Sequence, residues 1–275
     1  MRELLNSAAD ELARAGCPSP RVDAEWLLAQ VLGVTRTDLH ANGDKPLEPR
    51  EERRFRELVA RRARREPLAY VLGEWGFRGL TLKVDPRVLI PRPETEAVVE
   101  RCLELIAGLA EPRVLDVGVG SGAIALALAD EHPGAFVVAT DNSAGALAVA
   151  GENRTRAGLD EWVELVQGEL FAGQEGPFDL IVSNPPYVEP DELDGLEPEV
   201  ARYEPRAALV SNGVTEAIVG DAKGRLAPGG ALALETADGQ AGAVAELLGR
   251  LGYEQVSIGQ DLGGRERIVD GRAPR

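Results

Sequence analysis

Apolar residues recur every three or four positions through roughly the first 75 residues, which is the spacing of amphipathic helices. Gly16 and Pro18 end the first of these stripes, and Ser19-Pro20 begins the second. The members of three stripes are Leu4, Leu5, Ala8, Leu12 and Ala15; Val22, Trp26, Leu27 and Val31; and Phe55, Leu58, Val59 and Ala63. Strand-like alternation is not seen before Phe77, so we predict a helical domain over residues 1–76.

Residues 77–90 change to an extended pattern, with turn signals at Gly79 and at Asp85-Pro86. We interpret this stretch as a short hairpin. The segment 77–92 is therefore predicted to connect the helical domain to a second domain, which spans residues 93–275.

Strands and helices alternate from residue 113 onward. The early strand candidates are nearly continuous apolar runs, as expected where helices cover both faces of a sheet. The last two candidates are joined by Asp261-Leu262-Gly263-Gly264, a hairpin-like connection, so the last strand is expected to be antiparallel. The candidates are residues 113–118, 135–141, 163–169, 178–184, 230–235, 254–260 and 266–270. The predicted fold class is α/β, with an N-terminal helical bundle and a Rossmann-like domain built on a mostly parallel seven-stranded sheet.

Composition excludes several classes of protein. The 275 residues carry 30 Lys and Arg against 46 Asp and Glu, a net charge of −16, which argues against a protein that mainly grips phosphate backbones. Two cysteines and two histidines are too few for a disulfide framework or an obvious zinc site. Since neither a run of about 18 apolar residues nor a secretory signal is found, we expect a cytoplasmic protein that does not enter the membrane.

The charge is unevenly distributed along the chain. Residues 1–80 hold 14 Lys and Arg and 13 Asp and Glu, whereas residues 81–275 hold 16 and 33. The segment 50–65 alone contains 8 Arg and 3 Glu. We interpret this segment as the solvated face of an amphipathic helix, with docking of a protein partner and contact with RNA as the alternatives.

A glycine-rich loop, Gly118-Val119-Gly120-Ser121-Gly122, joins a buried strand that contains Asp116 to the next predicted helix. Glycines allow a tight turn and let a ligand approach the backbone closely. Asp141 ends the following strand, where a carboxylate can accept hydrogen bonds from ribose hydroxyls. The loop predicts a site for an adenosine-type ligand, and Asp116 favours one that carries an ammonium group. A nicotinamide cofactor or a plain strand-to-helix turn are the alternatives.

Asn184-Pro185-Pro186-Tyr187 follows the fourth strand candidate. The prolines stiffen the chain and lack N–H groups, so the backbone there offers only acceptors. With the side-chain carbonyl of Asn184 they can accept both hydrogens of an NH2 group, and Tyr187 supplies a flat surface for a planar amide or base. Holding both N–H groups favours the pyramidal nitrogen, whose lone pair can attack a methyl group on a sulfonium without help from histidine, cysteine or metal. The motif thus predicts an N-methyltransferase.

Further segments carry a family resemblance. They are Pro67–Tyr70 with Gly73, Phe77–Gly79, Val88–Glu96, Tyr203–Arg206, Pro228–Gly230 and Asp261–Arg265. Together with the glycine loop and Asn184–Tyr187, they resemble the HemK/PrmC family of release factor glutamine N(5)-methyltransferases over almost the whole chain. Asn-Pro-Pro-Tyr is shared with DNA adenine and some RNA methyltransferases, whereas Ile90–Glu96 behind a helical domain is much more specific.

The resemblance implies an enzyme of translation termination that uses S-adenosylmethionine, releases S-adenosylhomocysteine and needs no metal. Its substrate would be the glutamine of the Gly-Gly-Gln motif in peptide chain release factors 1 and 2, which the helical domain would help to dock. The implied cofactor site comprises Asp116, Gly118, Val119, Gly120, Ser121, Gly122, Asp141, Leu170 and Asn184. The implied catalytic residues, which hold the glutamine amide, are Asn184, Pro185, Pro186 and Tyr187. We expect a monomer without stable nucleic-acid binding.

The chain departs from the family pattern after the third strand. Relatives often have an acid followed by Trp and Phe there, whereas this chain reads Glu169-Leu170-Phe171, so Leu170 can cover an adenine ring but cannot stack on it. Three alternatives to the release-factor substrate stay open: a nucleic-acid base amino group, a ribosomal-protein glutamine, and a cofactor-binding module without activity. The acidity of residues 81–275 favours a protein over a duplex, and the intact Asn184–Tyr187 motif argues against an inactive module.

Overall fold

The computed structural model describes residues 1–41 and 46–275. These residues form two compact units: Met1–Glu74 with Leu196–Tyr203, and Trp75–Gly195 with Glu204–Arg275. This division differs from the boundaries expected from the sequence in two respects. The segment 77–92 belongs to the second unit instead of standing between two domains, and a short piece of the later chain belongs to the helical unit.

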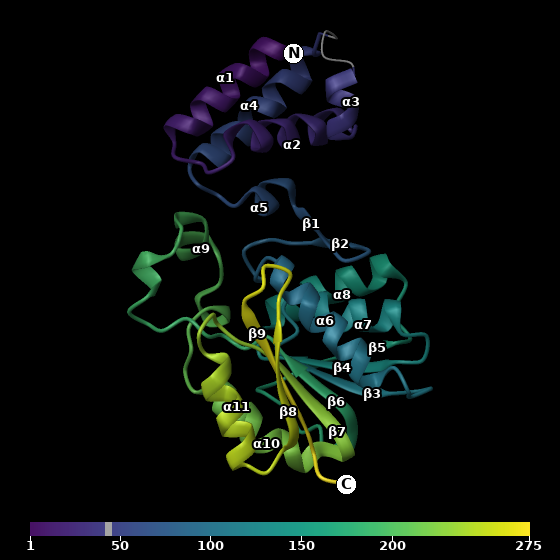
Figure 1. Ribbon diagram of the computed structural model, residues 1–275. Helices are drawn as coiled ribbons and strands as arrows, with labels where there is room; N and C mark the ends of the chain where they lie inside the picture. Colours follow the sequence, from purple (N-terminus) through teal and green to yellow (C-terminus); the bar gives the residue numbers. More distant parts are fainter. Residues whose placement is uncertain (42–45) are drawn as a thin grey trace. The chain divides into compact units, whose positions relative to one another are not determined.

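The first unit consists of helices that pack around one apolar core (Figure 1). They are α1 (Arg2–Arg14), α2 (Pro20–Leu32), α3 (Arg36–Ala41), α4 (Pro49–Ala63) and α5 (Leu68–Leu72). The unit also includes α9 (Pro198–Tyr203), which has no buried residue and adds nothing to this core. The most deeply buried side chains of this core are Leu12, Leu27, Leu28, Phe55 and Leu58. The N-terminal helical domain expected from the sequence is therefore confirmed.

The predicted apolar face of α2 is partly wrong. Val22 and Trp26 are 39% and 42% exposed, whereas Leu27 is buried as expected. The helix instead turns Ala24, Leu27 and Leu28 toward the core and buries two acids beside them, so polar residues interrupt the stripe that the sequence suggested. Trp26 lies on the surface, with the guanidinium of Arg36 5.6 Å from its ring centre.

The arginines around the end of α4 are not all solvated. Arg62 is only 3% exposed; its Nε donates to Asp23 at 2.8 Å and its Nη1 lies 2.8 Å from Glu199. Arg65 also pairs with Glu199, at 2.7 and 2.6 Å. These ion pairs hold the segment Leu196–Tyr203 within the helical unit, so the interpretation of 50–65 as a solvated face fails for Arg62 and Arg65. It holds for exposed pairs such as Arg56 with Glu52.

The second unit is built on a seven-stranded sheet with the strand order β5-β4-β3-β6-β7-β9-β8. The strands are β3 (Arg113–Val117), β4 (Phe136–Asp141), β5 (Val163–Gln167), β6 (Phe178–Ser183), β7 (Leu226–Glu235), β8 (Glu254–Gln260) and β9 (Glu266–Arg272). From β5 to β7 all neighbours are parallel, and β9 runs antiparallel to both β7 and β8. The predicted mostly parallel sheet with an antiparallel last strand is confirmed.

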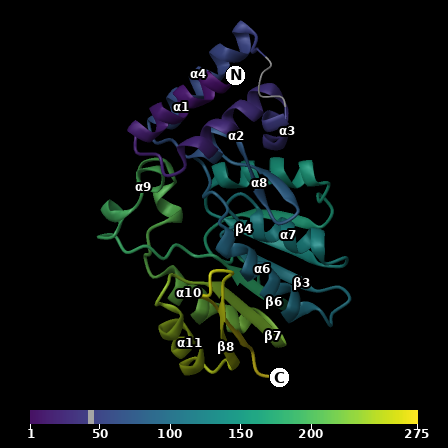
Figure 2. The same cartoon turned by 45° about the horizontal axis from the view of Figure 1, so that its top comes forward.

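Helices cover both faces of this sheet (Figures 1 and 2). One face packs against α6 (Pro93–Ile106), α7 (Ala123–Glu131) and α8 (Ala144–Ala157), and the other against α10 (Val214–Ala222) and α11 (Ala241–Arg250). The chain reverses its strand order at β3, which lies between β4 and β6. Loops that leave the carboxyl ends of β3 and β6 therefore diverge and open a crevice, the usual ligand position in such sheets.

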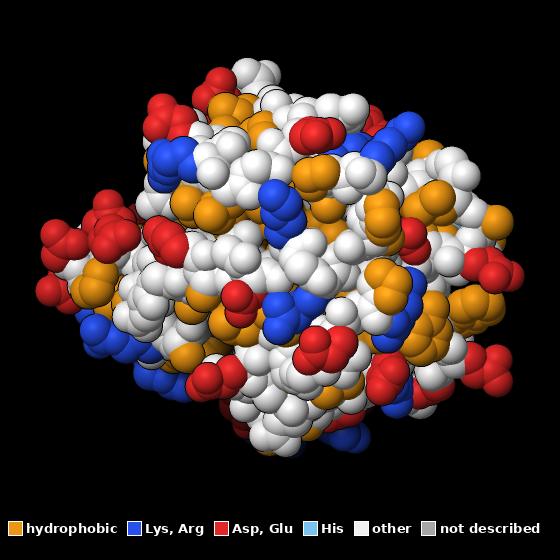
Figure 3. Space-filling model, turned by 90° about the horizontal axis from the view of Figure 1, so that it is seen from below, with side chains coloured by type: hydrophobic (Ala, Val, Ile, Leu, Met, Phe, Trp, Pro, Cys, Tyr) orange, Lys and Arg blue, Asp and Glu red, His pale blue; other side chains and the backbone are white. Residues whose placement is uncertain are grey.

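A two-stranded hairpin, β1 (Glu74–Phe77) and β2 (Leu80–Lys83), precedes the large sheet. Its first strand begins three residues before the extended pattern was expected to start, because only Phe77 of β1 is buried and the strand has no apolar face to detect. On the face drawn in Figure 3, acidic and basic side chains are intermingled. No helix within the described ranges is long and apolar enough to cross a bilayer.

Candidate active site

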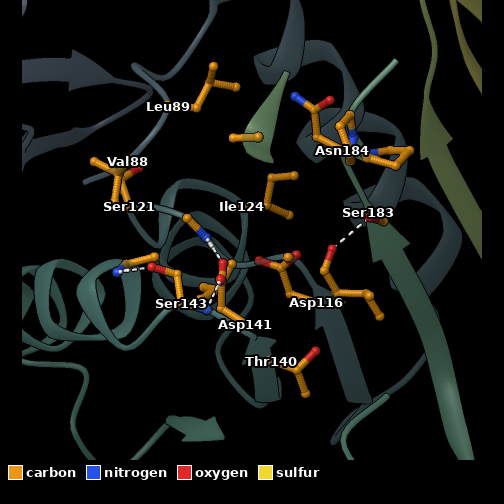
Figure 4. A pocket seen from close by; sticks show the side chains of 18 of the residues that line it. Val88, Leu89, Asp116, Ser121, Ile124, Thr140, Asp141, Ser143, Ser183 and Asn184 are labelled. Atoms are coloured by element: carbon orange, nitrogen blue, oxygen red, sulfur yellow. Dashed lines mark hydrogen bonds between the residues drawn. The ribbon is translucent and has the colours of Figure 1, made fainter. Parts of the chain in front are cut away.

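A cavity of about 260 Å³ lies in the second unit at the carboxyl ends of β3, β4 and β6. The glycine loop after β3 and residues 140–143 at the end of β4 line one side (Figure 4). The segment 183–186 after β6 and residues of 87–95 before and within α6 also line the cavity. The cavity thus joins the two motifs that the sequence analysis singled out separately.

The glycine loop adopts the left-handed backbone conformation at three positions, with φ of +85° at Gly118, +53° at Gly120 and +90° at Gly122. Residues other than glycine rarely adopt this conformation. The amides of Gly118 and Val119 both donate to the carbonyl of Thr140 at 2.9 Å, which ties the loop to the end of β4.

Gly122 does not line the cavity, unlike the four loop residues before it. It is the N-cap of α7, and a Cβ there would come within 2.9 Å of Leu126 Cδ1. Packing at the start of α7 requires a glycine at this position. A direct contact of Gly122 with the cofactor stays a prediction.

Asp141 is held in place by backbone amides at the edge of the cavity (Figure 4). Its Oδ2 accepts a hydrogen bond from the Gly120 amide at 3.0 Å, and its Oδ1 accepts one from the Ser143 amide at 2.8 Å. Ser143 in turn caps α8 by accepting from the Ala146 amide. These bonds give the carboxylate one orientation before any ligand arrives.

Asp116 is the buried acid of the cavity, only 1% exposed. Its Oδ2 accepts a hydrogen bond from the Ala125 amide at 3.1 Å, whereas its Oδ1 has no hydrogen-bond partner among the described residues. Burial raises the pKa of Asp116 to about 7, and the nearby charge of Asp141 adds to this rise. A buried oxygen without a partner is costly, so the site favours a ligand that brings a cationic donor.

Asn184 belongs to a chain of hydrogen bonds that the sequence analysis did not anticipate. Its Nδ2 donates to Thr95 Oγ1 at 3.3 Å, and the Thr95 hydroxyl donates to Glu235 Oε2 at 2.6 Å. Thr95 lies in the first turn of α6, and Glu235 is the last residue of β7. Burial raises the pKa of Glu235 to about 7.

Tyr187 is brought to the same carboxylate but not to the cavity wall. Asn184, Pro185 and Pro186 line the cavity, whereas Tyr187 does not. Its hydroxyl donates to Glu235 Oε1 at 3.5 Å. Burial and the adjacent Glu235 charge raise the pKa of Tyr187 to about 12, so the phenol stays protonated and acts as a donor. Stacking of its ring on a substrate stays a prediction.

Leu170 lines the cavity, and its contact with an adenine ring stays a prediction. Its φ is +48°, an unusual value for leucine, and its carbonyl accepts a hydrogen bond from Thr140 Oγ1 at 2.5 Å. The next residue, Phe171, is buried beneath the guanidinium of Arg225. The apolar side chain of Leu170 is therefore displayed to the cavity by an anchored backbone.

Thr95 and Glu235 were not predicted as site residues because neither belongs to a sequence motif whose residue types indicate a chemical role. Thr95 lies within Ile90–Glu96, which drew attention only through family resemblance, and Glu235 is a single acid at the end of an apolar strand. The position of Glu235 could have identified it, since a charged residue at the carboxyl end of a central parallel strand lies at the edge of the sheet where ligands bind. Among residues 1–39 and 46–275, no group of three or more His, Cys, Asp or Glu side chains is arranged to hold a metal ion.

Comparison with known proteins agrees with both units. Residues 3–73 match the PrmC N-terminal domain family, and residues 97–197 match the methyltransferase small domain family. The chain is 46% identical to the release factor glutamine methyltransferase of Geobacter sulfurreducens, with 99% of this chain and 96% of the relative covered. It is 44% identical to the protein of the same name from Deinococcus radiodurans, covering 99% and 98%.

Among solved structures, a methyltransferase from Pyrococcus furiosus superimposes with a TM-score of 0.52. It shares 22% sequence identity, and the match covers 72% of this chain and 90% of that one. At this identity the likeness concerns the fold alone.

Proposed function

Because the chain belongs to the family of release factor glutamine methyltransferases, we propose that it methylates the glutamine of the Gly-Gly-Gln motif in peptide chain release factors 1 and 2. The acceptor is the side-chain amide nitrogen, and the methyl donor is S-adenosylmethionine. The observation that carries this proposal is the single cavity in which Asp116 and the glycine loop face Asn184 and the two prolines after it.

The half of the cavity built on β3 and β4 fits S-adenosylmethionine, which supplies a methyl group on a sulfonium, a good leaving group. Asp116 Oδ1 would accept from the ammonium group of its methionine part, since this buried oxygen has no partner among the described residues. The carboxylate of Asp141 would accept from the ribose hydroxyls. Leu170 would cover the adenine by apolar contact.

The half built on β6 fits a carboxamide. An amide nitrogen is a poor nucleophile because its lone pair is delocalised into the carbonyl group. Asn184 Oδ1 and the backbone carbonyls of the proline segment would accept the two N–H groups and turn the lone pair toward the methyl carbon. As the N–C bond forms and the S–C bond breaks, the nitrogen loses one proton to solvent.

Three expectations stay predictions within this proposal. The enzyme is expected to act without a metal ion, as a monomer, and in the cytoplasm. Each is tested separately from the activity, by treatment with a chelator, by light scattering in solution, and by fractionation of cells.

The test uses the purified protein with S-adenosylmethionine labelled in its methyl group. Release factor, its Gln→Ala variant in the Gly-Gly-Gln motif, ribosomes and duplex DNA are incubated separately. We expect label on the release factor and none on its variant. Label that persists on the variant would overturn the choice of glutamine, and label on ribosomes or DNA alone would favour the corresponding alternative substrate.

A further inference from the structure

We propose that Glu235 is a positioning residue that orients both ends of the Asn184–Tyr187 segment, Asn184 through Thr95 and Tyr187 directly. The inference rests on the proposed function, because it concerns how this site presents an acceptor to the substrate amide. It assigns Glu235 and Thr95 roles in which neither side chain needs to touch the substrate.

The sheet brings Glu235 beside the segment. In the parallel pair of β6 and β7, Ser183 lies opposite Leu234, so the residues that follow, Asn184 and Glu235, leave the sheet together. Glu235 is only 1% exposed, and Thr95 is also buried. A buried carboxylate is strongly destabilising unless its oxygens are satisfied, and here each oxygen accepts from a different hydroxyl.

The direction of these hydrogen bonds determines which end of the Asn184 amide faces the cavity. An ionised carboxylate only accepts, so Thr95 must donate its proton to Glu235. The hydroxyl of Thr95 can then only accept from Asn184, which turns the NH2 group toward Thr95. The Asn184 carbonyl oxygen is thereby presented to the substrate, as an acceptor of an amide N–H must be.

Tyr187 uses the second oxygen of the same carboxylate. Its hydroxyl donates to Oε1 while Thr95 donates to Oε2. The Glu235 side chain therefore orients Tyr187 directly and Asn184 through Thr95. The φ angles of the two prolines between them are fixed by their rings, so the backbone from Asn184 to Tyr187 is stiff and the hydrogen bonds at its two ends position it together.

Protonation of Glu235 should break this arrangement, since one of its oxygens would become a donor. The titratable groups of the described residues that act on Glu235 are Glu94 on α6, Arg267 on β9, and Tyr187, which is neutral and donates a hydrogen bond. Burial outweighs the stabilising charge of Arg267, and the pKa of Glu235 is raised to about 7. The rate of methyl transfer should therefore be full above this pH and fall below it.

The test compares Glu235→Gln, Thr95→Val and Thr95→Ser with wild type in single-turnover methylation of a release factor. The glutamine side chain has one acceptor oxygen and one NH2 donor, so it cannot accept from Thr95 and Tyr187 through two separate oxygens as the carboxylate does. Valine removes the hydroxyl that links Asn184 to Glu235. We expect each to lower the rate by about 10- to 100-fold, the usual effect of losing a residue that orients a ligand group. Thr95→Ser should stay within about threefold, and binding of S-adenosylmethionine should change by less than about threefold in all three.

Two matched controls separate positioning from folding. Thr236→Val is the control for Thr95→Val, because the buried Thr236 hydroxyl has no hydrogen-bond partner among the described residues. Asp270→Asn is the control for Glu235→Gln, since Asp270 is a buried carboxylate that pairs with Arg101 away from the cavity. We expect both controls to keep the rate within about threefold while changing the melting temperature.

Two further readouts distinguish the outcomes. With S-adenosylmethionine kept saturating at every pH, the decline of the rate below about pH 7 should be lost in Glu235→Gln. Hydrogen exchange of the Asn184 side-chain NH2, followed by NMR, should accelerate in Thr95→Val. Near-normal rates with an unchanged pH profile in Glu235→Gln and Thr95→Val would overturn the inference. Failure of wild type to methylate the release factor would instead overturn the proposed function, while the NMR comparison would still test the relay.

Discussion

The two halves of the cavity are built in different ways. The proposed cofactor half, comprising Asp116, the glycine loop and Asp141, comes from one short stretch of chain whose backbone amides hold the acidic side chains. In the proposed amide half, Asn184 and Thr95 line the cavity and Glu235 lies behind them; the three come from separate segments, of which two are separated by 140 positions. Local backbone geometry is sufficient to prepare a binding surface, whereas orienting a single side-chain amide requires a relay from distant elements.

A buried carboxyl group lies in or behind each half, and burial raises the pKa of each to about 7. The two differ in whether their oxygens have hydrogen-bond partners. Asp116 keeps one oxygen without a partner among the described residues, which suits a residue that awaits a cationic ligand. Glu235 has both oxygens occupied by hydroxyls, which suits a residue whose work is structural orientation. Removing each charge should therefore affect binding in one case and rate in the other.

The largest effect is expected from Asn184→Ala. Loss of the acceptor that holds the substrate N–H should lower the single-turnover rate by about 10²- to 10³-fold, as removal of one preorganised hydrogen-bonding group does in other enzymes. Affinity for S-adenosylmethionine should change by less than about tenfold, roughly 1.4 kcal/mol, because Asp116 and Asp141 are unaltered. Calorimetry and a rapid-quench methylation assay measure the two quantities. Asn212→Ala, at an exposed position, is the control, and near-normal turnover in Asn184→Ala would refute the proposal that Asn184 holds the substrate amide.

Asp116→Asn should show the converse pattern. Loss of a charge-assisted hydrogen bond to the ammonium group should weaken binding of S-adenosylmethionine by about 10- to 100-fold. The rate at saturating cofactor should change much less. The same substitution should stabilise the cofactor-free protein at pH 8 by on the order of 2 kcal/mol, because it removes a buried charge. Urea unfolding with and without cofactor checks both effects, and a variant that is less stable at pH 8 would contradict the role of burial.

The pH dependence of cofactor binding follows from the same carboxyl group. Because the pKa of Asp116 is raised to about 7, its stabilising contribution to the folded protein is present at low pH and is lost as the pH rises through about 7. Binding of an ammonium group requires the ionised form. The dissociation constant should therefore increase by about tenfold for each pH unit below 7 in wild type and stay nearly constant in Asp116→Asn. A flat profile in wild type would show that another group meets the ammonium.

Two glycines of the same loop are expected to differ, one acting mainly on cofactor binding and the other mainly on packing. Both have positive φ, but a Cβ on Gly120 would meet open space, whereas one on Gly122 would approach Leu126 within 2.9 Å. Gly120→Ala should cost about 1 kcal/mol of stability and should weaken cofactor binding, because Gly120 lines the cavity. Gly122→Ala should cost about 2 kcal/mol or more, with little direct effect on binding. Equal losses of stability in the two variants would contradict this division.

The contrast also explains what could be read from the sequence. The glycine loop, Asp141 and the Asn184–Tyr187 motif are short local patterns whose residue types indicate a chemical role. The sequence placed them at the ends of the strands where the structure has them. Thr95 and Glu235 become meaningful only after the sheet and α6 bring them together. No spacing rule connects residues of such separation, so the relay could not be predicted.

The fold shows the same limit. The strands of the large sheet were predicted because buried parallel strands are continuous apolar runs. The face of α2 was not, because Asp23 is buried in an ion pair with Arg62 and thus breaks the apolar stripe. Likewise, the arginine-rich segment was read as solvated, and only the position of Glu199 in the structure reveals an internal partner for Arg62 and Arg65.

The smallest effect is expected at Leu170, where the cofactor half departs from the family pattern. Its side chain lines the cavity but offers no aromatic face. Leu170→Phe should tighten binding of S-adenosylmethionine by about fivefold, the lower end of what stacking on a base contributes. The positive φ at this position is as unfavourable for leucine as for phenylalanine, so the comparison isolates the side chain. Leu262→Phe, on the largely exposed turn between β8 and β9, is the control and should leave affinity unchanged. If Leu170→Phe binds no more tightly, the adenine does not lie against this residue, and the apolar cover of the cofactor half must come from another part of the cavity wall.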